Sequence, residues 1–227
     1  MKAIIGRKIG MTQVFAADGT MYPVSVIEVL PNVVVDKRTT EKNGYEALIV
    51  GYEDKAERKL TKPELGLYKK AGVATKEHLY ELKGDEIYGK AIGETLTADL
   101  FQAGDVVDVI GHNKGHGYTG TIKRYHMTIG PKGHGSGYHR GIGSAANNGR
   151  CNNRIIPGKH MSGHWGPKQV TVQNITVVET NAEKGYILVK GGVPGPKKSI
   201  VMLRTPVRTQ FNKPEVKAPI DLTKKGE

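Results

Sequence analysis

Apolar, β-branched residues come in short runs separated by turn residues through the first half of the chain. Valine, isoleucine and aromatic residues dominate these runs, which is typical of β-strands. The predicted strands are an early run within 1–15, MYPVSVIEVL (21–30), VVVDKRT (33–39), YEALIVGYE (45–53) and DVVDVI (105–110). Asn43-Gly44 separates two of them and predicts a tight hairpin turn, because both residue types accept positive φ.

Two short segments carry helix-start and helix-stop residues instead. KPELGLYKKA (62–71) has a proline in its first turn and Gly72 directly after its end, the usual order of these residues around a helix. TADLFQAG (97–104) begins with a threonine that could cap a helix and ends in glycine. We therefore predict a small helical insertion near residues 61–104.

Strand-like runs return in the last third of the chain. They are QVTVQNITVVET (169–180), GYILVKG (185–191) and KKSIVMLRT (197–205). Many short strands with close turns, and no regular alternation of strands with helices, predict a mostly β fold with minor α, an antiparallel barrel or sandwich. Residues 206–227 are rich in proline and poor in apolar residues, so we predict a flexible C-terminal tail.

The segment between the two strand series, residues 111–168, differs in kind. It holds fourteen of the thirty glycines and seven of the eight histidines, with few apolar residues. Such a segment cannot bury enough surface to offset its chain entropy of roughly 1–2 kcal/mol per residue. A loop of this length inside a compact domain needs a partner of its own. We expect the segment either to lack order or to be ordered by something outside the protein.

Charge identifies the class of that partner. The net charge is +12, yet residues 1–108 are close to neutral, with 15 basic and 17 acidic side chains. Residues 109–178 hold nine Lys or Arg and no Asp or Glu. A segment of this composition attracts polyanions. The chain has no apolar run long enough for a membrane helix, and its single cysteine, Cys151, excludes an internal disulfide.

One glycine motif could suggest a cofactor. Gly115, Gly117 and Gly120 follow a predicted strand with the Gly-x-Gly-x-x-Gly spacing of dinucleotide-binding loops. That site needs a helix opening at the third glycine and an acid about twenty residues later. The following sequence has no sustained helical periodicity, and no acid occurs before Glu179. We predict no bound cofactor and no small-molecule substrate.

Histidine spacing raises the question of a metal. His112 and His116 are four residues apart, as are His160 and His164, and Cys151 lies between the pairs. Both pairs are interrupted by glycine, and no acid is available to orient a histidine ligand or to act as a general base. We predict no metal site and no catalytic residues. A metal-dependent enzyme stays as a minor alternative, which metal analysis of the purified protein would decide.

The same segment fits the physical description of an RNA-binding arm. Its cations are spread along the chain, its glycines let the backbone approach phosphates, and its tyrosines, histidines and tryptophan offer rings on which bases can stack. If about six to nine phosphates are neutralised, the log–log slope of affinity against salt should be on the order of −4 to −8.

Several blocks along the chain are shared, in order, with one known family. They are GRKIGMTQVF (6–15), SVIEVL (25–30), TKPELGLYKKAGV (61–73), GHGYTGTIKRYHM (115–127), HGSGYHRGIGS (134–144), PGKHMSGHWG (157–166), VTVQNITVV (170–178) and LVKGGVPGPKKSIV (188–201). With these blocks the sequence resembles the large-subunit ribosomal protein three family, bacterial type.

The resemblance implies an architecture and a function. Residues 1–110 and 169–205 would form an antiparallel β-barrel of the translation-factor type, with the helical insertion near 61–104. The glycine-rich basic loop 111–168 would enter the large-subunit ribosomal RNA, with its tip near the peptidyl transferase centre. The protein would be a non-enzymatic constituent of the cytoplasmic ribosome that supports early subunit assembly and touches neighbouring large-subunit proteins. The alternative is a general nucleic-acid-binding or RNA-chaperone protein that acts off the ribosome.

The candidate binding residues are basic, aromatic or histidine side chains, with two early cations and the loop tip added. The predicted rRNA-binding residues are Arg7, Lys8, Lys114, His116, Tyr118, Lys123, Arg124, Tyr125, Lys132, His134, Tyr138, His139, Arg140, Arg150, Arg154, Lys159, His160, His164, Trp165 and Lys168. The predicted tip residues are Ser144, Asn147, Asn148, Arg150, Cys151, Asn152, Asn153 and Arg154.

Overall fold

The chain divides into two compact units, each of which is treated by itself. The computed structural model describes residues 1–16, 18–145, 154–208, 216–217 and 219–220. Unit 1 combines Met1–His112 with Gln169–Glu227, and unit 2, which we call the arm, is Asn113–Lys168. The arm is inserted in sequence between two strands of unit 1, which end at His112 and begin at Gln169.

The elements of both units are mostly short strands. In chain order they are β1 (Ala3–Phe15), β2 (Met21–Glu28), β3 (Asn32–Arg38), α1 (Thr40–Asn43), β4 (Ala47–Asp54), α2 (Lys62–Ala71), β5 (Lys76–Leu82), α3 (Asp85–Tyr88), β6 (Thr95–Leu96), β7 (Val106–His112), β8 (Tyr118–Thr119), α4 (Thr121–Tyr125), β9 (Gly163–His164), β10 (Gln169–Asn181), β11 (Tyr186–Lys190) and β12 (Ile200–Arg204), with 3-10 turns at Glu57–Lys59 and Ala98–Leu100. None of the helices in the described part of the chain is both long enough and apolar enough to cross a membrane.

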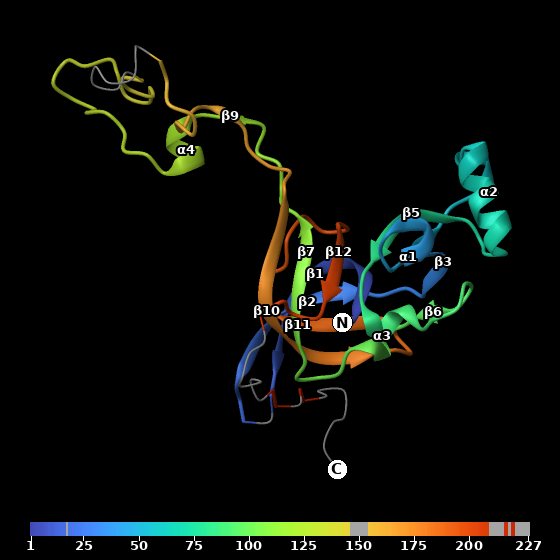
Figure 1. Cartoon of the computed structure of the whole chain (residues 1–227). Coiled ribbons are helices and arrows are strands. Elements are labelled where there is room, and N and C mark those ends of the chain that lie inside the picture. The colour runs from blue at the N-terminus through green and yellow to red at the C-terminus, as the bar shows by residue number, and fades with distance from the viewer. Residues whose placement is uncertain (17, 146–153, 209–215, 218, 221–227) are drawn as a thin grey trace. The chain divides into compact units, whose positions relative to one another are not determined.

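Six strands of unit 1 close into an antiparallel barrel in the order β1-β12-β7-β10-β11-β2 (Figure 1). Their registers align apolar side chains across neighbouring strands. Ile4 of β1 lies opposite Leu203 of β12, which in turn lies opposite Val109 of β7, and all three are fully buried. Alternating side chains of one face thus fill the barrel. The prediction of a mostly β fold with an antiparallel barrel is confirmed.

A second sheet, β5-β4-β3-β6, shares its hydrophobic core with the barrel. Asn32 at the start of β3 is fully buried and binds the backbone of β1 with both side-chain atoms. Its Oδ1 accepts the Ile5 N–H at 3.2 Å, and its Nδ2 donates to the Ile5 carbonyl at 3.0 Å. A buried amide that is satisfied in this way fixes how the sheet meets the barrel.

Tyr52 of β4 makes a second link to the barrel. Its ring is fully buried, and its hydroxyl donates to the Glu28 carbonyl at 3.1 Å. Burial raises the pKa of Tyr52, so the phenol stays protonated and keeps donating. We expect Tyr52→Phe to lower the free energy of unfolding by about 1 kcal/mol, because the carbonyl loses its buried partner. Urea unfolding measures this, and an unchanged midpoint would show that the link adds no stability.

The sequence predicts both ends of helix α2. Helix α2 spans Lys62–Ala71, as predicted, and Gly72 ends it with a left-handed φ of 67°. At its start the Glu64 carboxylate accepts the Thr61 N–H at 2.9 Å. This contact lowers the pKa of Glu64 and favours a negative charge at the helix N-terminus.

Other local predictions had mixed outcomes. The helix predicted for residues 97–104 is only the 3-10 turn Ala98–Leu100, because the following backbone turns into the barrel: the Gly104 N–H donates to the Val177 carbonyl at 2.9 Å. The hairpin predicted from Asn43-Gly44 is confirmed: β3 and β4 pair antiparallel, and the helical turn α1 joins them, followed by Gly44 with a left-handed φ of 78°. Strand β5, KEHLYEL, was not predicted. Its charged residues obscure the alternation of more buried and more exposed side chains along the strand.

The described tail residues contact the β1–β2 end of unit 1. The Ile220 N–H donates to the Phe15 carbonyl at 2.8 Å, and Lys217 Nζ lies 2.6 Å from the Asp18 carboxylate. Hydrogen bonds from Lys217 and Thr20 hold the pKa of Asp18 well below its usual range. These residues add a short β-bridge between Ala16 and Pro219, and the flexibility of the tail as a whole stays a prediction.

Candidate nucleic-acid interface

The arm closes on itself at its base through antiparallel backbone contacts. The Asn113 N–H donates to the Lys168 carbonyl at 2.9 Å, and the His116 N–H donates to the Trp165 carbonyl at 2.8 Å. Two residue pairs, Tyr118 with His164 and Thr119 with Gly163, form the small sheet β8-β9. The sequence predicts no structure here without an outside partner, and at the base the structure differs from that prediction.

Three ring pairs join the two sides of the arm. His116 stacks on Trp165 with centroids 4.1 Å apart, and Tyr125 stacks on His160 at 4.0 Å and an interplanar angle of 3°. Tyr118 meets His164 edge-on at 5.8 Å. Such pairs contribute about 0.5–1.5 kcal/mol beyond their buried area. In this structure, the rings that we expect to stack on bases contact one another instead. These contacts order the arm locally.

A short helix follows the glycine motif. Helix α4 starts after Gly120, so the expectation that nothing helical opens there was wrong for Thr121–Tyr125. The Arg124 guanidinium donates to the Met161 carbonyl at 3.0 Å and lies over the Tyr125 ring, which ties this helix to the opposite side of the arm. The dinucleotide interpretation still fails, because no acid follows before Glu179 and the preceding strand belongs to an antiparallel barrel.

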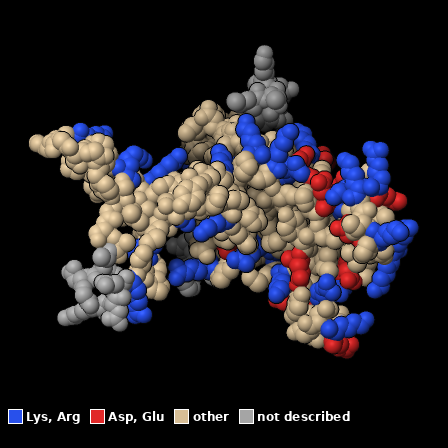
Figure 2. All heavy atoms as spheres, turned by 90° about the horizontal axis from the view of Figure 1, so that it is seen from above, with Lys and Arg blue, Asp and Glu red and all other residues tan. Residues whose placement is uncertain are grey.

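Most of the described cations of the arm are exposed to solvent, and no acid lies near them in sequence. Exposed described cations of the arm are Lys114, Lys123, Lys132, Arg140, Arg154, Lys159 and Lys168. Arg124 is half-buried by the contacts described above. The arm is drawn on the left in both Figure 1 and Figure 2. On that side of Figure 2, Lys and Arg side chains (blue) are visible and Asp and Glu side chains (red) are not. Uncompensated charges of one sign attract a polyanion and repel one another without it.

The loop between the helix and the tip has its own turn contacts. The Gly130 N–H donates to the His139 carbonyl at 2.9 Å, and a ring nitrogen of His139 lies 2.8 Å from the Pro131 carbonyl oxygen. The Tyr138 hydroxyl accepts the Gly143 N–H. These contacts leave Lys132, His134 and Arg140 exposed at the surface of the loop.

The predicted tip lies partly outside the described residues. Ser144 and Arg154 border it and are described. The tip predictions that lie outside the described residues are Asn147, Asn148, Arg150, Cys151, Asn152 and Asn153.

Two predicted binding residues, Arg7 and Lys8, are already engaged within unit 1. The Arg7 guanidinium pairs with the Glu53 carboxylate, whose hydrogen bond raises the pKa of Arg7. Lys8 Nζ donates to the Val193 carbonyl at 2.8 Å and to the Gly195 carbonyl at 3.0 Å. Both side chains therefore have a structural use on β1, and their contact with RNA stays a prediction.

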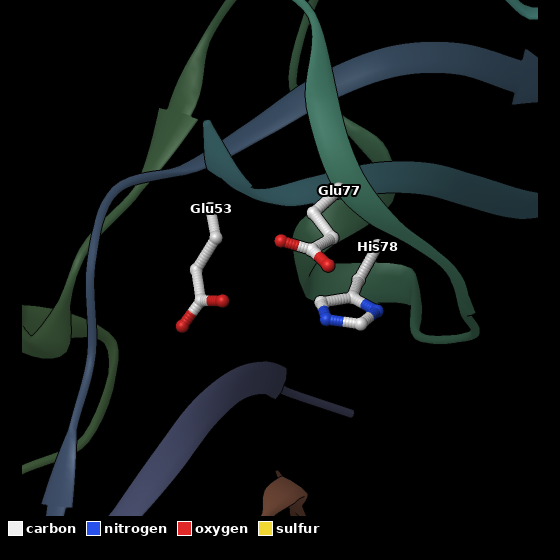
Figure 3. A group of neighbouring side chains, drawn as sticks. All are labelled: Glu53, Glu77 and His78. Carbon is white, nitrogen blue, oxygen red and sulfur yellow. The ribbon is translucent and has the colours of Figure 1, made fainter. Parts of the chain in front are cut away.

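Metal-binding side chain types meet at one place in the described residues, and it lies outside the arm. Glu53, Glu77 and His78 have ligand atoms within 4.8 Å of one another (Figure 3). The Glu53 carboxylate is also the ion-pair partner of Arg7. The Arg7 guanidinium therefore already supplies a positive charge beside the carboxylate that would bind a metal ion. Sequence reasoning missed this group because the register of β4 against β5 brings its members together across more than twenty residues.

The fold and the arm define a class of protein: a closed antiparallel barrel that carries a long, acid-free basic arm. Comparison with known proteins identifies the family within this class. A family model described as "Ribosomal protein L3" matches residues 85–185. The chain belongs to this family, as relatives that match about nine-tenths of it show.

Those relatives bear one name, "Large ribosomal subunit protein uL3". The protein of Spiroplasma kunkelii is 46% identical over 208 residues, which are 92% of this chain and 79% of that protein. The protein of Geobacillus sp. (strain WCH70) is 44% identical over 209 residues, 92% of this chain and 98% of the relative. The family resemblance found in the sequence is thereby confirmed.

Proposed function

We propose that this protein is a structural constituent of the large ribosomal subunit that binds large-subunit (23S-type) ribosomal RNA directly through its arm. The observation that carries the proposal is the nine-cation segment without a carboxylate. Its described cations are solvent-exposed apart from Arg124. Backbone hydrogen bonds between the two ends of the arm hold the cations near those ends at fixed distances from one another. The names of its relatives supply the large subunit as the site of action.

The arm would bind in two ways along its length. Lys123, Lys132 and Arg140 would neutralise successive phosphates, while glycine backbone near them allows close approach. At the base, the exposed ring of Tyr118, with 70% of its surface accessible, would stack on an unpaired base. The tip would reach toward the peptidyl transferase centre and steady RNA there, and the protein itself would catalyse no step.

The same proposal includes early subunit assembly and contact with neighbouring large-subunit proteins. An RNA segment that must close around an arm can do so most easily before the surrounding RNA is compact. The near-neutral charge of residues 1–108 leaves that part of unit 1 available for protein partners.

A sucrose gradient tests the proposal. We expect the tagged full chain to sediment with large subunits from cytoplasmic lysate and to stay bound through a moderate salt wash. As a control, purified full chain is offered equal amounts of ribosomal RNA and duplex DNA, and RNA should be preferred. Chain that remains at the top of the gradient and binds DNA equally well would instead identify a general nucleic-acid binder acting off the ribosome.

A further inference from the structure

The connection between β11 and β12, residues 191–199, is packed on the barrel, and we call it the barrel loop. Val193 within it is buried in the barrel core. Lys8 of β1 holds the loop with both its backbone and its side chain. Its N–H donates to the Ser199 carbonyl at 2.9 Å, and its carbonyl accepts the Lys198 N–H at 2.7 Å. Its Nζ donates to two further loop carbonyls. The barrel loop therefore has a fixed position on unit 1.

Two adjacent lysines of the barrel loop, Lys197 and Lys198, are exposed. Lys197 lies over β1, because its Cε is 3.7 Å from the place that a Cβ of Gly10 would take. Lys198 has a left-handed φ of 68°, which a glycine would adopt without strain. The shape of the loop therefore does not explain why a lysine stands at this position. Residues held in such a conformation cluster at binding sites, which directs attention to the charge of Lys198.

A third lysine, Lys190 at the end of β11, lies on the same face of the barrel wall as Gly10. Lys190 lies opposite Val24 of β2, and Gly10 lies opposite Val26 of the same strand. Residues two apart on a strand point to one face, and two strand spacings with two residues separate positions 10 and 190 by about 12 Å. Lys190 Nζ lies 5.0 Å from the centroid of the Tyr22 ring, a contact that restrains an exposed side chain. One stretch of RNA backbone can contact cations at this separation.

No carboxylate balances these three lysines. Residues 184–214 hold seven Lys or Arg and no Asp or Glu. The strand segments that contact the barrel loop, which lie within residues 8–17, 19–27 and 109–112, contain no acid either. Among the residues that the structure describes, none forms an ion pair with any of the three lysines. Their charges are therefore available to an anionic ligand.

We propose that Lys190, Lys197 and Lys198 form a second RNA-binding site, separate from the arm, that takes the phosphate backbone. Lysines without acids near them neutralise phosphates and release counterions, whereas the cores of protein interfaces are depleted of lysine. The barrel loop, all of which the structure describes, exposes no large apolar side chain that could anchor a protein. Because Lys8 already fixes the loop, little entropy is lost on binding. The inference rests on the proposed function for the identity of the RNA, and it assigns to the barrel a contact that the arm does not explain.

Lysine acetylation tests the proposal on the intact full chain. The purified chain, alone or saturated with large-subunit ribosomal RNA, is treated briefly with an acetylating reagent, and mass spectrometry measures the rate at each lysine. We expect RNA to slow acetylation of Lys197 and Lys198 by about fivefold or more, because bound phosphates cover their amines. Lys69 and Lys70, which are also exposed but lie on α2, should keep their rates. Protection of Lys132 in the arm without protection of the barrel loop overturns the second site and leaves the proposed function standing. If neither the arm nor the loop is protected, the proposed function fails as well.

Charge removal gives an independent measurement. We expect replacement of Lys190, Lys197 and Lys198 together by glutamine to weaken binding to ribosomal RNA by about 10–10²-fold near 0.1 M salt and to make the log–log salt slope shallower by about 2. Arginine at the same three positions keeps the charges and should keep both the affinity and the slope. Thermal unfolding of both variants checks that the barrel stays folded. An unchanged slope in the folded glutamine variant, or an equal loss of affinity in the arginine variant, overturns the proposal.

Discussion

Replacing Lys123, Lys132, Arg140 and Lys159 together by glutamine is expected to weaken binding to ribosomal RNA by about 10²–10³-fold near 0.1 M salt. All four are exposed side chains of the arm. Each phosphate that loses its cation keeps its counterion, so each substitution removes about 0.7–0.9 from the log–log salt slope. The slope should therefore become shallower by about 3. Filter binding or fluorescence anisotropy over a salt series measures both quantities.

The matched control removes the same charge from unit 1. Lys42, Lys59, Lys69 and Lys70 are also exposed, but they lie on or beside α1 and α2, among acidic residues. Their replacement by glutamine should change the affinity less than threefold and leave the slope within about 0.5 of its original value. Equal losses from both sets would mean that net charge alone drives binding and that the arm has no special part in it.

The barrel and the arm were both predictable from local patterns, for opposite reasons. Runs such as GYILVKG, which forms barrel strand β11, have strand propensity, and the cap residues around 62–71 define α2, so local chemistry agreed with the final fold. The arm was recognised by what its sequence lacks: carboxylates and apolar residues. Composition of this kind needs no knowledge of tertiary contacts.

Contacts between distant residues were the part that the sequence did not reveal. His116 and Trp165 stand almost fifty residues apart, and no periodicity connects them. The same holds for Arg7 with Glu53, an ion pair that joins β1 to β4, while the contact of Arg7 with RNA stays a prediction. In both cases strand or segment pairing creates the neighbourhood, and the entropy of closing the intervening loop must be offset by contacts that a single sequence does not display.

The paired base changes how the arm is expected to bind. A segment of this composition has too few apolar residues to form a core of its own. The three ring pairs and the few backbone hydrogen bonds at the base require no such core, because they only join the two sides of the arm near its ends. The arm then has a self-ordered base, and we propose that RNA fixes the part beyond it. An ordered base reduces the entropy lost on binding, because the cations near it are already spaced.

Gly166→Ala should open this base. Gly166 has a left-handed φ of 67°, and an added Cβ would lie 2.3 Å from the Lys114 carbonyl oxygen, so the two sides of the base must separate. In the free protein we expect amide hydrogen-exchange protection at His116 and Trp165 to fall by about 10²-fold, equivalent to about 3 kcal/mol. Fluorescence of Trp165, the one tryptophan of the chain, should report loss of its stacked environment.

Gly158→Ala separates backbone strain from the steric clash. Gly158 also has a left-handed φ, 88°, but nothing lies within 4 Å of its would-be Cβ. It should cost about 1 kcal/mol locally and leave protection at the base intact. If the amides of His116 and Trp165 exchange without protection even in the unsubstituted free protein, the base is not ordered alone. RNA would then have to order the whole arm, and the advantage of a preformed base would disappear.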